Sequence, residues 1–521
     1  MHVINLFHQI SFPLCFGALL SFILERLLYP KSPAIWRLPE GALFIHLGLW
    51  ILAFSLLLAI NRRPHFAAAN VSVLLFLLVL ISNAKYQALK EPLIFQDFNV
   101  LLYPFKYPRM YLPFFGMVRF CLVTITIGGA VFLGLTMEQS LLESFPPTTF
   151  GFVVMTFCFI GGLLIWLGSK KDLPLVLNPE IDLSRLGLLA CLWRYSSEER
   201  KPFSFPHARI FLTPPIPRYL DLPHLVVVES ESFFDIRRCF PAIRPEILRN
   251  FDLLKNDSIS HGLLEVPAWG ANTMRSEFAF LSGIENNTLG IHRFNPYRYL
   301  KNQKVPSLAS YLKRLGYRTV CIHPHYCEFF DRNKVFPRLG FDEFMDIKSF
   351  NGAPKSGPYV GDVALANQVS QLLKGHAENS MQPIFLFIIT MENHGPLGLE
   401  KVEPSEISHY YDSTPTVGYN ELTIYLRHLV NSDAMIKILR VCLQSLDRNS
   451  YFCFFGDHVP IMKKVYKFGR TPDGLTDYII WSKERSLNKS VNRKMDIWNL
   501  SSLLLLEMGI LNPNDLLPGV S

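Results

Sequence analysis

Five long apolar runs, all free of Lys, Arg, Asp and Glu, crowd the first 170 residues and restrict the possible folds more than any other feature. Each run is close to the ~20 residues that a helix needs to cross the hydrocarbon core of a bilayer. A single run could be a buried helix of a soluble protein, but five together predict a membrane domain over residues 1–170, with about five transmembrane helices. The runs cover residues 1–24, 41–61, 66–84, 120–137 and roughly 148–169.

The number and the orientation of these helices are less well determined. The aromatic stretch at 98–117 could form an interfacial or re-entrant helix. Basic residues gather in the first and third loops, so the positive-inside rule places these loops in the cytoplasm. With five spans, the same rule would place the large C-terminal part there as well. The basic residues of the two loops are Arg26, Lys31, Arg37, Lys85, Lys90, Lys106 and Arg109.

Charge and cysteine content exclude some classes of protein. The net charge of +8 is modest and dispersed, which is compatible with an anionic lipid surface and gives no indication of nucleic-acid binding. Nine cysteines in 521 residues are too few and too scattered for a disulfide scaffold. Cys321 and Cys327 are close enough in sequence to form a disulfide if the compartment is oxidising, and the sequence leaves open whether this disulfide forms.

The pattern changes twice after the membrane domain. Residues 171–222 are rich in proline and charge and indicate a linker. From 223 to 515, short apolar runs alternate with helical patterns, which predicts a mainly parallel sheet covered on both faces and therefore an α/β domain. The predicted strands are 224–230, 318–323, 384–390 and 451–456, and helices are predicted around 306–315 and 498–509.

Polar side chains follow three of these strands. They are Glu229 and Glu231, then Glu392 and His394, then Asp457 and His458. Ligands of open α/β sheets gather at the carboxyl ends of the strands, and carboxylates with an imidazole suit a hard or borderline divalent metal. Each residue alone could belong to an ordinary turn or helix cap, but their convergence predicts a metal site.

One threonine is presented in an unusual way. Thr273 follows a small Gly-Ala-Asn turn and precedes an apolar run with helical spacing. At a helix N-terminus, free backbone N–H groups and the helix dipole favour a phosphate or sulfate. Near a divalent ion, its hydroxyl would be a competent nucleophile at neutral pH. The alternative is that Asn272 or Thr273 only caps the helix.

These motifs, in this order, resemble the lipoteichoic acid synthase and phosphoglycerol transferase group of the alkaline phosphatase and sulfatase superfamily. The resemblance covers nearly the whole chain and includes the loop KEPLIFQDF between two membrane runs. The motifs are VVVESESFFD, GANTMRSEFAFLSG, the HPH…FFDRNKVFPRLGFDEF block, FLFIITMENHGP and FFGDHVP.

The resemblance implies a sulfatase-like α/β fold and a set of site residues. The implied ligands of one divalent metal ion, usually Mn²⁺ or Mg²⁺ and less often Zn²⁺, are Glu231, Thr273, Asp457 and His458. Thr273 would be the nucleophile, and His394 and Arg332 would contact the substrate phosphate and its headgroup. His325 is a further candidate for substrate binding, at a position where some relatives carry an acidic or other polar residue.

The resemblance also implies a function and a location. Thr273 would take phosphoglycerol from a phospholipid such as phosphatidylglycerol and pass it to an envelope glycan or a glycerol-phosphate polymer. Relatives are multi-pass proteins of the bacterial cytoplasmic membrane with the catalytic domain outside, which conflicts with the loop charges. We favour the location that the family implies, because the lipid donors and polymer acceptors of this group meet outside the membrane.

Several alternatives stay open at this point. A phosphoethanolamine transferase would also use threonine, typically with zinc and a disulfide-rich domain, which the sparse cysteines disfavour. A sulfatase needs Cys or Ser followed by x-Pro-x-Arg, but Met-Arg-Ser follows Thr273. Outside this class, the chain could be an inactive envelope-assembly module or a zinc protein that uses His323, His325 and Cys327. The acceptor, and transfer as opposed to hydrolysis, are also open.

Overall fold

The computed structural model describes residues 2–100, 103–106, 117–212, 221–413, 418–484 and 490–512. The chain divides into two compact units, Met1–Pro202 and Phe203–Ser521. Each unit buries its own apolar side chains.

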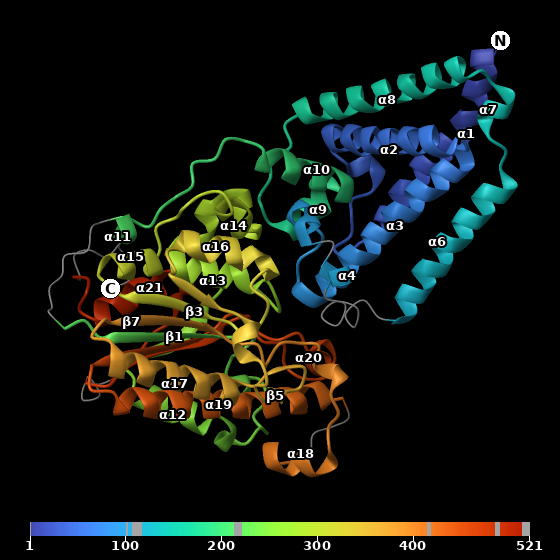
Figure 1. Cartoon of the computed structure of the whole chain (residues 1–521). Helices are drawn as coiled ribbons and strands as arrows, with labels where there is room; N and C mark the ends of the chain where they lie inside the picture. Colours follow the sequence, from blue (N-terminus) through green and yellow to red (C-terminus); the bar gives the residue numbers. More distant parts are fainter. Residues whose placement is uncertain are drawn as a thin grey trace. The chain divides into compact units, whose positions relative to one another are not determined.

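The first unit is helical (Figure 1). Four of its helices are long and apolar enough to cross a membrane, and they coincide with four of the predicted runs. The fifth run, 120–137, lies in helix α6 (Met117–Met137), whose crossing of a membrane stays a prediction. Most of the aromatic stretch 98–117 lies outside the described residues. The four helices are α1 (His2–Glu25), α2 (Glu40–Asn61), α3 (Pro64–Leu89) and α8 (Pro147–Lys170), and α4 (Tyr103–Lys106) and α7 (Leu141–Ser144) are short.

Glycines allow two of these helices to pack closely. Gly41 and Gly48 of α2 face Gly161 and Gly168 of α8, with the same spacing of seven residues on both helices. A Cβ atom at Gly48 would lie 2.7 Å from the carbonyl oxygen of Gly161, and one at Gly168 would lie 2.6 Å from that of Gly41. Small residues at such contacts let apolar helices approach closely where no hydrophobic effect drives them together.

The structure differs from the predicted linker at 171–222. Helices α9 (Pro179–Leu186) and α10 (Leu188–Glu199) belong to the first unit. The Glu25 carboxylate accepts hydrogen bonds from the backbone N–H groups of Leu188 and Leu189, at 3.1 and 3.0 Å, and so caps α10. Further along, Phe211 is buried in the core of the second unit. Proline and charge content could not reveal these partners, because they lie far away in the sequence.

The second unit is built on one sheet of nine strands, in the order β10-β2-β9-β8-β1-β7-β3-β4, with β11 paired to β2. Strand β1 lies between β8 and β7 and is parallel to both, whereas β9 is antiparallel to β2 and β8. The four predicted strands are confirmed. The strands are β1 (His224–Ser230), β2 (Ser260–Glu265), β3 (Arg318–Ile322), β4 (Glu343–Met345), β7 (Ile384–Ile389), β8 (Ser450–Gly456), β9 (Thr476–Ser482), β10 (Val491–Asn492) and β11 (Met495–Asp496).

Helices cover both faces of this sheet (Figure 1). On β1, Leu225 and Val227 contribute to one core, and Val226 and Val228 to the other, because successive side chains of a strand point to opposite faces. The expected α/β class with a mainly parallel sheet is therefore confirmed. One core includes residues of α13 (Thr273–Ser282), α14 (Pro296–Leu300), α15 (Leu308–Arg314), α16 (Arg332–Leu339) and α21 (Ile497–Glu507), and the other includes residues of α12 (Arg249–Asn256), α17 (Asp362–Asn379), α19 (Asn420–Ser445) and α20 (Lys463–Phe468).

Smaller elements complete the second unit. A separate hairpin is formed by β5 (Lys355–Ser356) and β6 (Tyr359–Val360). Helices α11 (Arg209–Leu212) and α18 (Pro404–Tyr410) are short. The hairpin matters for the site because it carries Tyr359, which contacts His394.

Candidate functional site

Two neighbouring strands bring three predicted ligands together. Strands β1 and β8 are parallel and end side by side, with Ser230 opposite Gly456, so the next residues of both strands lie at the same edge of the sheet. Glu231, Asp457 and His458 are buried there, and one ligand atom of each lies within 4.8 Å of the other two. The His458 Nε2 atom is 3.2 Å from Asp457 Oδ2 and 3.6 Å from Glu231 Oε1.

Hydrogen bonds fix one side of this triad and leave the other side unsatisfied. The Ser232 N–H donates to Asp457 Oδ1 at 2.7 Å, and the Ser232 hydroxyl donates to Glu231 Oε1 at 2.7 Å. In contrast, Asp457 Oδ2 and His458 Nε2 are buried and make no hydrogen bond. Buried polar atoms without partners are costly. Two carboxylates and one imidazole around these atoms therefore fit a divalent cation of the Mn²⁺, Mg²⁺ or Zn²⁺ type.

The two carboxylates differ in their protonation. Burial raises the pKa of Asp457 to about 7, although the nearby His458 opposes this shift. Burial would raise the pKa of Glu231 as well, but the charges of His394 and His458 outweigh it and hold that pKa below its ordinary value. Without a cation, Asp457 is therefore protonated at acidic pH while Glu231 stays ionised. A bound cation would favour the charged form of both carboxylates.

Thr273 lies directly against this triad. Gly270 and Asn272 adopt left-handed backbone conformations, with φ values of 69° each, and helix α13 begins at Thr273. The Thr273 hydroxyl donates to Glu231 Oε2 at 3.4 Å. Asn272 holds the N-cap position but makes no capping hydrogen bond through its side chain. The turn therefore directs the Thr273 hydroxyl to the carboxylate, and the capping alternative finds no support.

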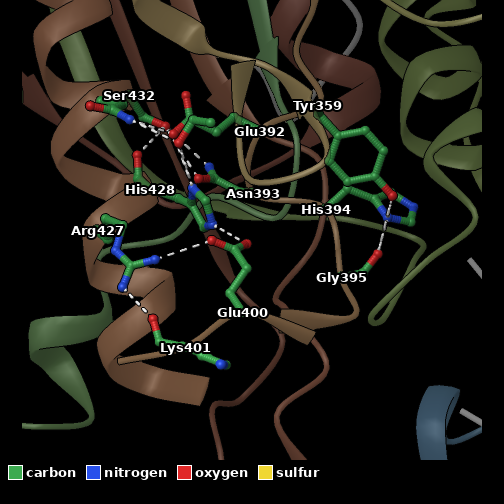
Figure 2. Close-up of polar contacts among 12 residues, drawn as sticks. Tyr359, Glu392, Asn393, His394, Gly395, Glu400, Lys401, Arg427, His428 and Ser432 are labelled. Carbon is green, nitrogen blue, oxygen red and sulfur yellow. Dashed lines mark hydrogen bonds and ion pairs between the residues drawn. The ribbon is translucent and has the colours of Figure 1, made fainter. Parts of the chain in front are cut away.

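His394 follows strand β7, in a loop shown in Figure 2. It is partly exposed, whereas the three ligand candidates are buried. Its Nδ1 atom lies 2.5 Å from the carbonyl oxygen of Gly395 and 3.3 Å from the hydroxyl of Tyr359. Because a carbonyl oxygen only accepts, Nδ1 must carry a proton, and Nε2 is the nitrogen that can exchange a proton with a substrate.

Arg332 is held by another residue of the protein. Its guanidinium donates from Nη2 to Glu277 Oε2 at 2.9 Å and from Nε to the same oxygen at 3.1 Å, and both side chains are buried. Its Nη1 atom lies 3.3 Å from His323 Nε2. Binding of a substrate headgroup by Arg332 therefore stays a prediction. His325 is also buried and packs against the ring of Phe329, and its role stays a prediction too.

Sequence reasoning missed some buried charged residues and misplaced one. Glu277 lies four residues after Thr273, which is one helical turn, so this spacing could have found it. Glu392 was expected to converge with the metal ligands, but its carboxylate binds His428 on α19 at 3.0 Å. No sequence signal pointed to His428, which lies in the middle of a long helix. Glu229 is buried, and neither of its carboxylate oxygens has a hydrogen-bond partner.

The structure gives no support to the zinc site considered for the segment HPHYC or to a disulfide between Cys321 and Cys327. Within the described ranges, two groups of side chains could hold a metal ion, and neither includes His323 or His325. The second group consists of Cys327, Glu328 and Asp346. Cys321, which is buried in strand β3, and Cys327, which lies near Glu328 and Asp346, are both free thiols.

Comparisons with known proteins agree with the fold described above. A family model described as Sulfatase matches residues 223–510. A capsular polysaccharide biosynthesis protein of Rhizobium meliloti is 29% identical over 87% of this chain and 85% of its own length. A lipoteichoic acid synthase of Staphylococcus aureus is 25% identical over 39% of this chain and 31% of its own length. The fold is shared with an integral membrane lipooligosaccharide phosphoethanolamine transferase of Neisseria meningitidis, with 12% identity, 90% coverage of both chains and a TM-score of 0.53.

Proposed function

Because this chain belongs to the sulfatase family, we propose that it is a membrane-bound phosphotransferase that moves a phospholipid headgroup to an envelope acceptor through a covalent threonine intermediate. One observation carries the proposal. The hydroxyl of Thr273, at the first position of a helix, lies 3.4 Å from Glu231 and beside the buried pair of Asp457 and His458. This is the arrangement that an activated nucleophile requires.

The residues that would hold a cation are Glu231, Thr273, Asp457 and His458. The unsatisfied atoms Asp457 Oδ2 and His458 Nε2 support this assignment. When bound, a divalent cation would neutralise negative charge on the phosphate oxygens and lower the pKa of the threonine hydroxyl. The oxygen-rich donor set favours manganese or magnesium over zinc.

The residues of the chain can carry out both steps of a double displacement. Thr273 Oγ1 attacks the phosphorus, and the bond from phosphorus to the diacylglycerol oxygen breaks. The Thr273 hydroxyl donates to Glu231, which would take its proton, and the imidazolium form of His394 would protonate the departing oxygen from Nε2. In the second step, an acceptor hydroxyl attacks the phosphorus, His394 takes the proton of that hydroxyl, the bond from phosphorus to Thr273 Oγ1 breaks, and Glu231 returns the proton that regenerates the threonine hydroxyl.

We further propose phosphatidylglycerol as the donor and an envelope glycan as the acceptor. The similarity to lipoteichoic acid synthase supports a phosphoglycerol donor. The similarity to a capsular polysaccharide biosynthesis protein, over most of both chains, supports a glycan acceptor. A membrane domain in the same chain would keep the site near lipid donors, and such proximity lowers the entropic cost of the first step.

The test is a comparison of lipid products. Purified full-length protein, incubated with phosphatidylglycerol vesicles, Mn²⁺ and an envelope glycan fraction, should release diacylglycerol and place phosphoglycerol on the glycan. Thr273→Ala protein should release none. If the protein releases free glycerol phosphate, whether or not the glycan fraction is present, it is a hydrolase and the proposed transfer is wrong. Diacylglycerol release from phosphatidylethanolamine alone would replace the proposed donor.

A second experiment tests the location of the catalytic unit. We fuse two reporters after residue 521, one that is active only outside the cytoplasm and one that is active only inside it. We expect only the first to be active, because donor headgroups and glycan acceptors meet outside the cytoplasmic membrane. One of the basic loop residues that argue for the opposite orientation is neutralised internally. The Lys85 ammonium is mostly buried and binds Glu91 at 2.6 Å and Asp97 at 2.7 Å. Reporter activity confined to the cytoplasm would favour the positive-inside rule and contradict the proposed location.

A further inference from the structure

A fully buried histidine lies between two carboxylates, next to the loop of His394 (Figure 2). His428 Nδ1 is 3.0 Å from Glu392 Oε1, and His428 Nε2 is 2.9 Å from Glu400 Oε1. Ionised carboxylates only accept hydrogen bonds, so both ring nitrogens of His428 donate and the ring carries a positive charge. Burial lowers the pKa of His428, but the bonds to Glu392 and Glu400 outweigh burial and raise it to about 9.

The two carboxylates lie at the two ends of the loop that holds His394. Glu392 is two residues before His394, and Glu400 is six residues after it. One side chain of α19 therefore binds both ends of the segment 392–400 at once. Because α19 packs against α17 and the sheet through a large apolar core, the loop is fastened to the rigid part of the unit.

Each end of this segment is also fixed by other groups. Glu392 accepts a hydrogen bond from Asn431 at 2.5 Å and from the backbone N–H of Asp362 at 2.6 Å. Glu400 lies 3.2 Å from Arg427 Nη1. These contacts orient the carboxylates toward His428, so the imidazolium has little freedom to bind them in another arrangement.

The same loop is connected to the metal triad. The side-chain amide of Asn393 donates to the backbone carbonyl of Glu231 at 3.0 Å and to the Ser432 hydroxyl at 3.1 Å. Asn393, which lies between Glu392 and His394, therefore contacts the main chain of the candidate ligand Glu231.

We propose that His428 is a positioning residue for His394, and that it holds the loop 392–400 so that the His394 ring stands at the leaving-group side of the substrate phosphate. His428 touches no reacting atom in this arrangement and acts only through the loop. The role of His394 in this proposal rests on the proposed function. The clamp, by which we mean the contacts of His428 with Glu392 and Glu400, rests on the distances given above.

The clamp itself can be tested without any substrate. In His428→Gln, the neutral amide has a single donating nitrogen, which cannot replace the two ring nitrogens that face different carboxylates, and Glu392 keeps a buried charge without the positive charge of its partner. Hydrogen exchange of peptides from 390–400 should become at least about tenfold faster, while peptides of β1 and β8 stay protected. The matched control is His376→Gln, because His376 is also buried but its Nε2 atom binds the Gln382 carbonyl. Unchanged exchange at 390–400, or faster exchange throughout the unit, would overturn the proposal.

A double-mutant cycle tests whether His428 acts through His394. With a soluble phosphodiester whose leaving group is an aliphatic alcohol, and with Mn²⁺, His428→Gln should lower kcat by about 10²-fold, because the departing alkoxide needs the proton of His394 and a misplaced catalytic group costs about that much. In a His394→Ala background, the same change should cost less than about threefold, because the residue that it positions is gone. Equal losses in both backgrounds would show that His428 acts independently and would overturn the proposal.

Two further arms keep the outcome interpretable. If His428→Gln does not fold, the pair His428→Gln with Glu392→Gln removes the buried charge, and the same exchange and kinetic results are expected of it. Transfer from phosphatidylglycerol is measured separately. If the unmodified protein shows no transfer from phosphatidylglycerol, the proposed donor is wrong. Hydrogen exchange of the peptides from 390–400 would still decide whether His428 holds this loop.

Discussion

Replacing Thr273 with alanine should abolish turnover while the catalytic unit stays folded. Removal of a covalent nucleophile typically lowers kcat by ~10⁴-fold or more. The stability cost should be only about 1 kcal/mol, because the hydroxyl makes one long hydrogen bond to Glu231 and Thr273 does not hold the N-cap position. Turnover of the diester and thermal unfolding, measured on the same protein, would check both statements.

Thr273→Ser is the sharper comparison. Serine keeps the hydroxyl at the same position, so measurable activity should remain. When the acceptor is withheld, a covalent mechanism leaves the glycerol-phosphate group on residue 273, which adds ~154 Da to that peptide in a mass spectrum. Normal turnover in Thr273→Ala, or an adduct on another residue, would contradict the proposed nucleophile.

Replacing Asp457 with alanine should remove both the bound metal and the activity. Asp457 Oδ2 is buried without a hydrogen bond, so it is the atom most clearly prepared for a cation. Changes in residues that merely support a ligand already cost 10- to 100-fold in metal affinity or activity, so loss of a ligand should lower Mn²⁺ affinity by more than ~100-fold. Metal content by mass spectrometry of the purified protein is the measurement.

Glu229→Gln provides the control for this experiment. Glu229 is a buried carboxylate two residues before Glu231, but it does not belong to the triad. Burial raises the pKa of Glu229 well above its ordinary value, so the neutral glutamine should be tolerated. Stoichiometric metal in Asp457→Ala, or loss of metal in Glu229→Gln, would show that the ligands have been assigned incorrectly.

The stabilisation of the protein by a bound cation should depend on pH. Burial raises the pKa of Asp457 from its ordinary value of 3.8 to about 7. Between these values the folded state binds more protons than the unfolded state, so the metal-free protein loses stability as pH rises toward 7. A cation binds the deprotonated site and restores this stability. The rise in Tm on adding Mn²⁺ should therefore be larger at pH 8 than at pH 5.5.

The sequence by itself determined the elements and the class of the fold. Apolar runs at 224–230, 384–390 and 451–456 form buried parallel strands, because a strand covered on both faces requires a continuous apolar sequence. Four apolar runs of the first unit form long helices. Polar residues directly after such strands are therefore visible as a candidate site. Thr273 was also visible, because a small turn before an apolar helical run is a local signal.

Only the tertiary structure decided which polar residues belong together. It separates Glu231, in the triad, from Glu229, and it pairs Arg332 with Glu277 and His428 with Glu392 and Glu400. These partners are 28 to 55 residues apart in the pairs that involve histidine or arginine. Local sequence patterns report which side chains can be buried. The choice of partner depends on how distant helices pack on the sheet, because a buried charge is tolerated only where that packing supplies an opposite charge or a cation.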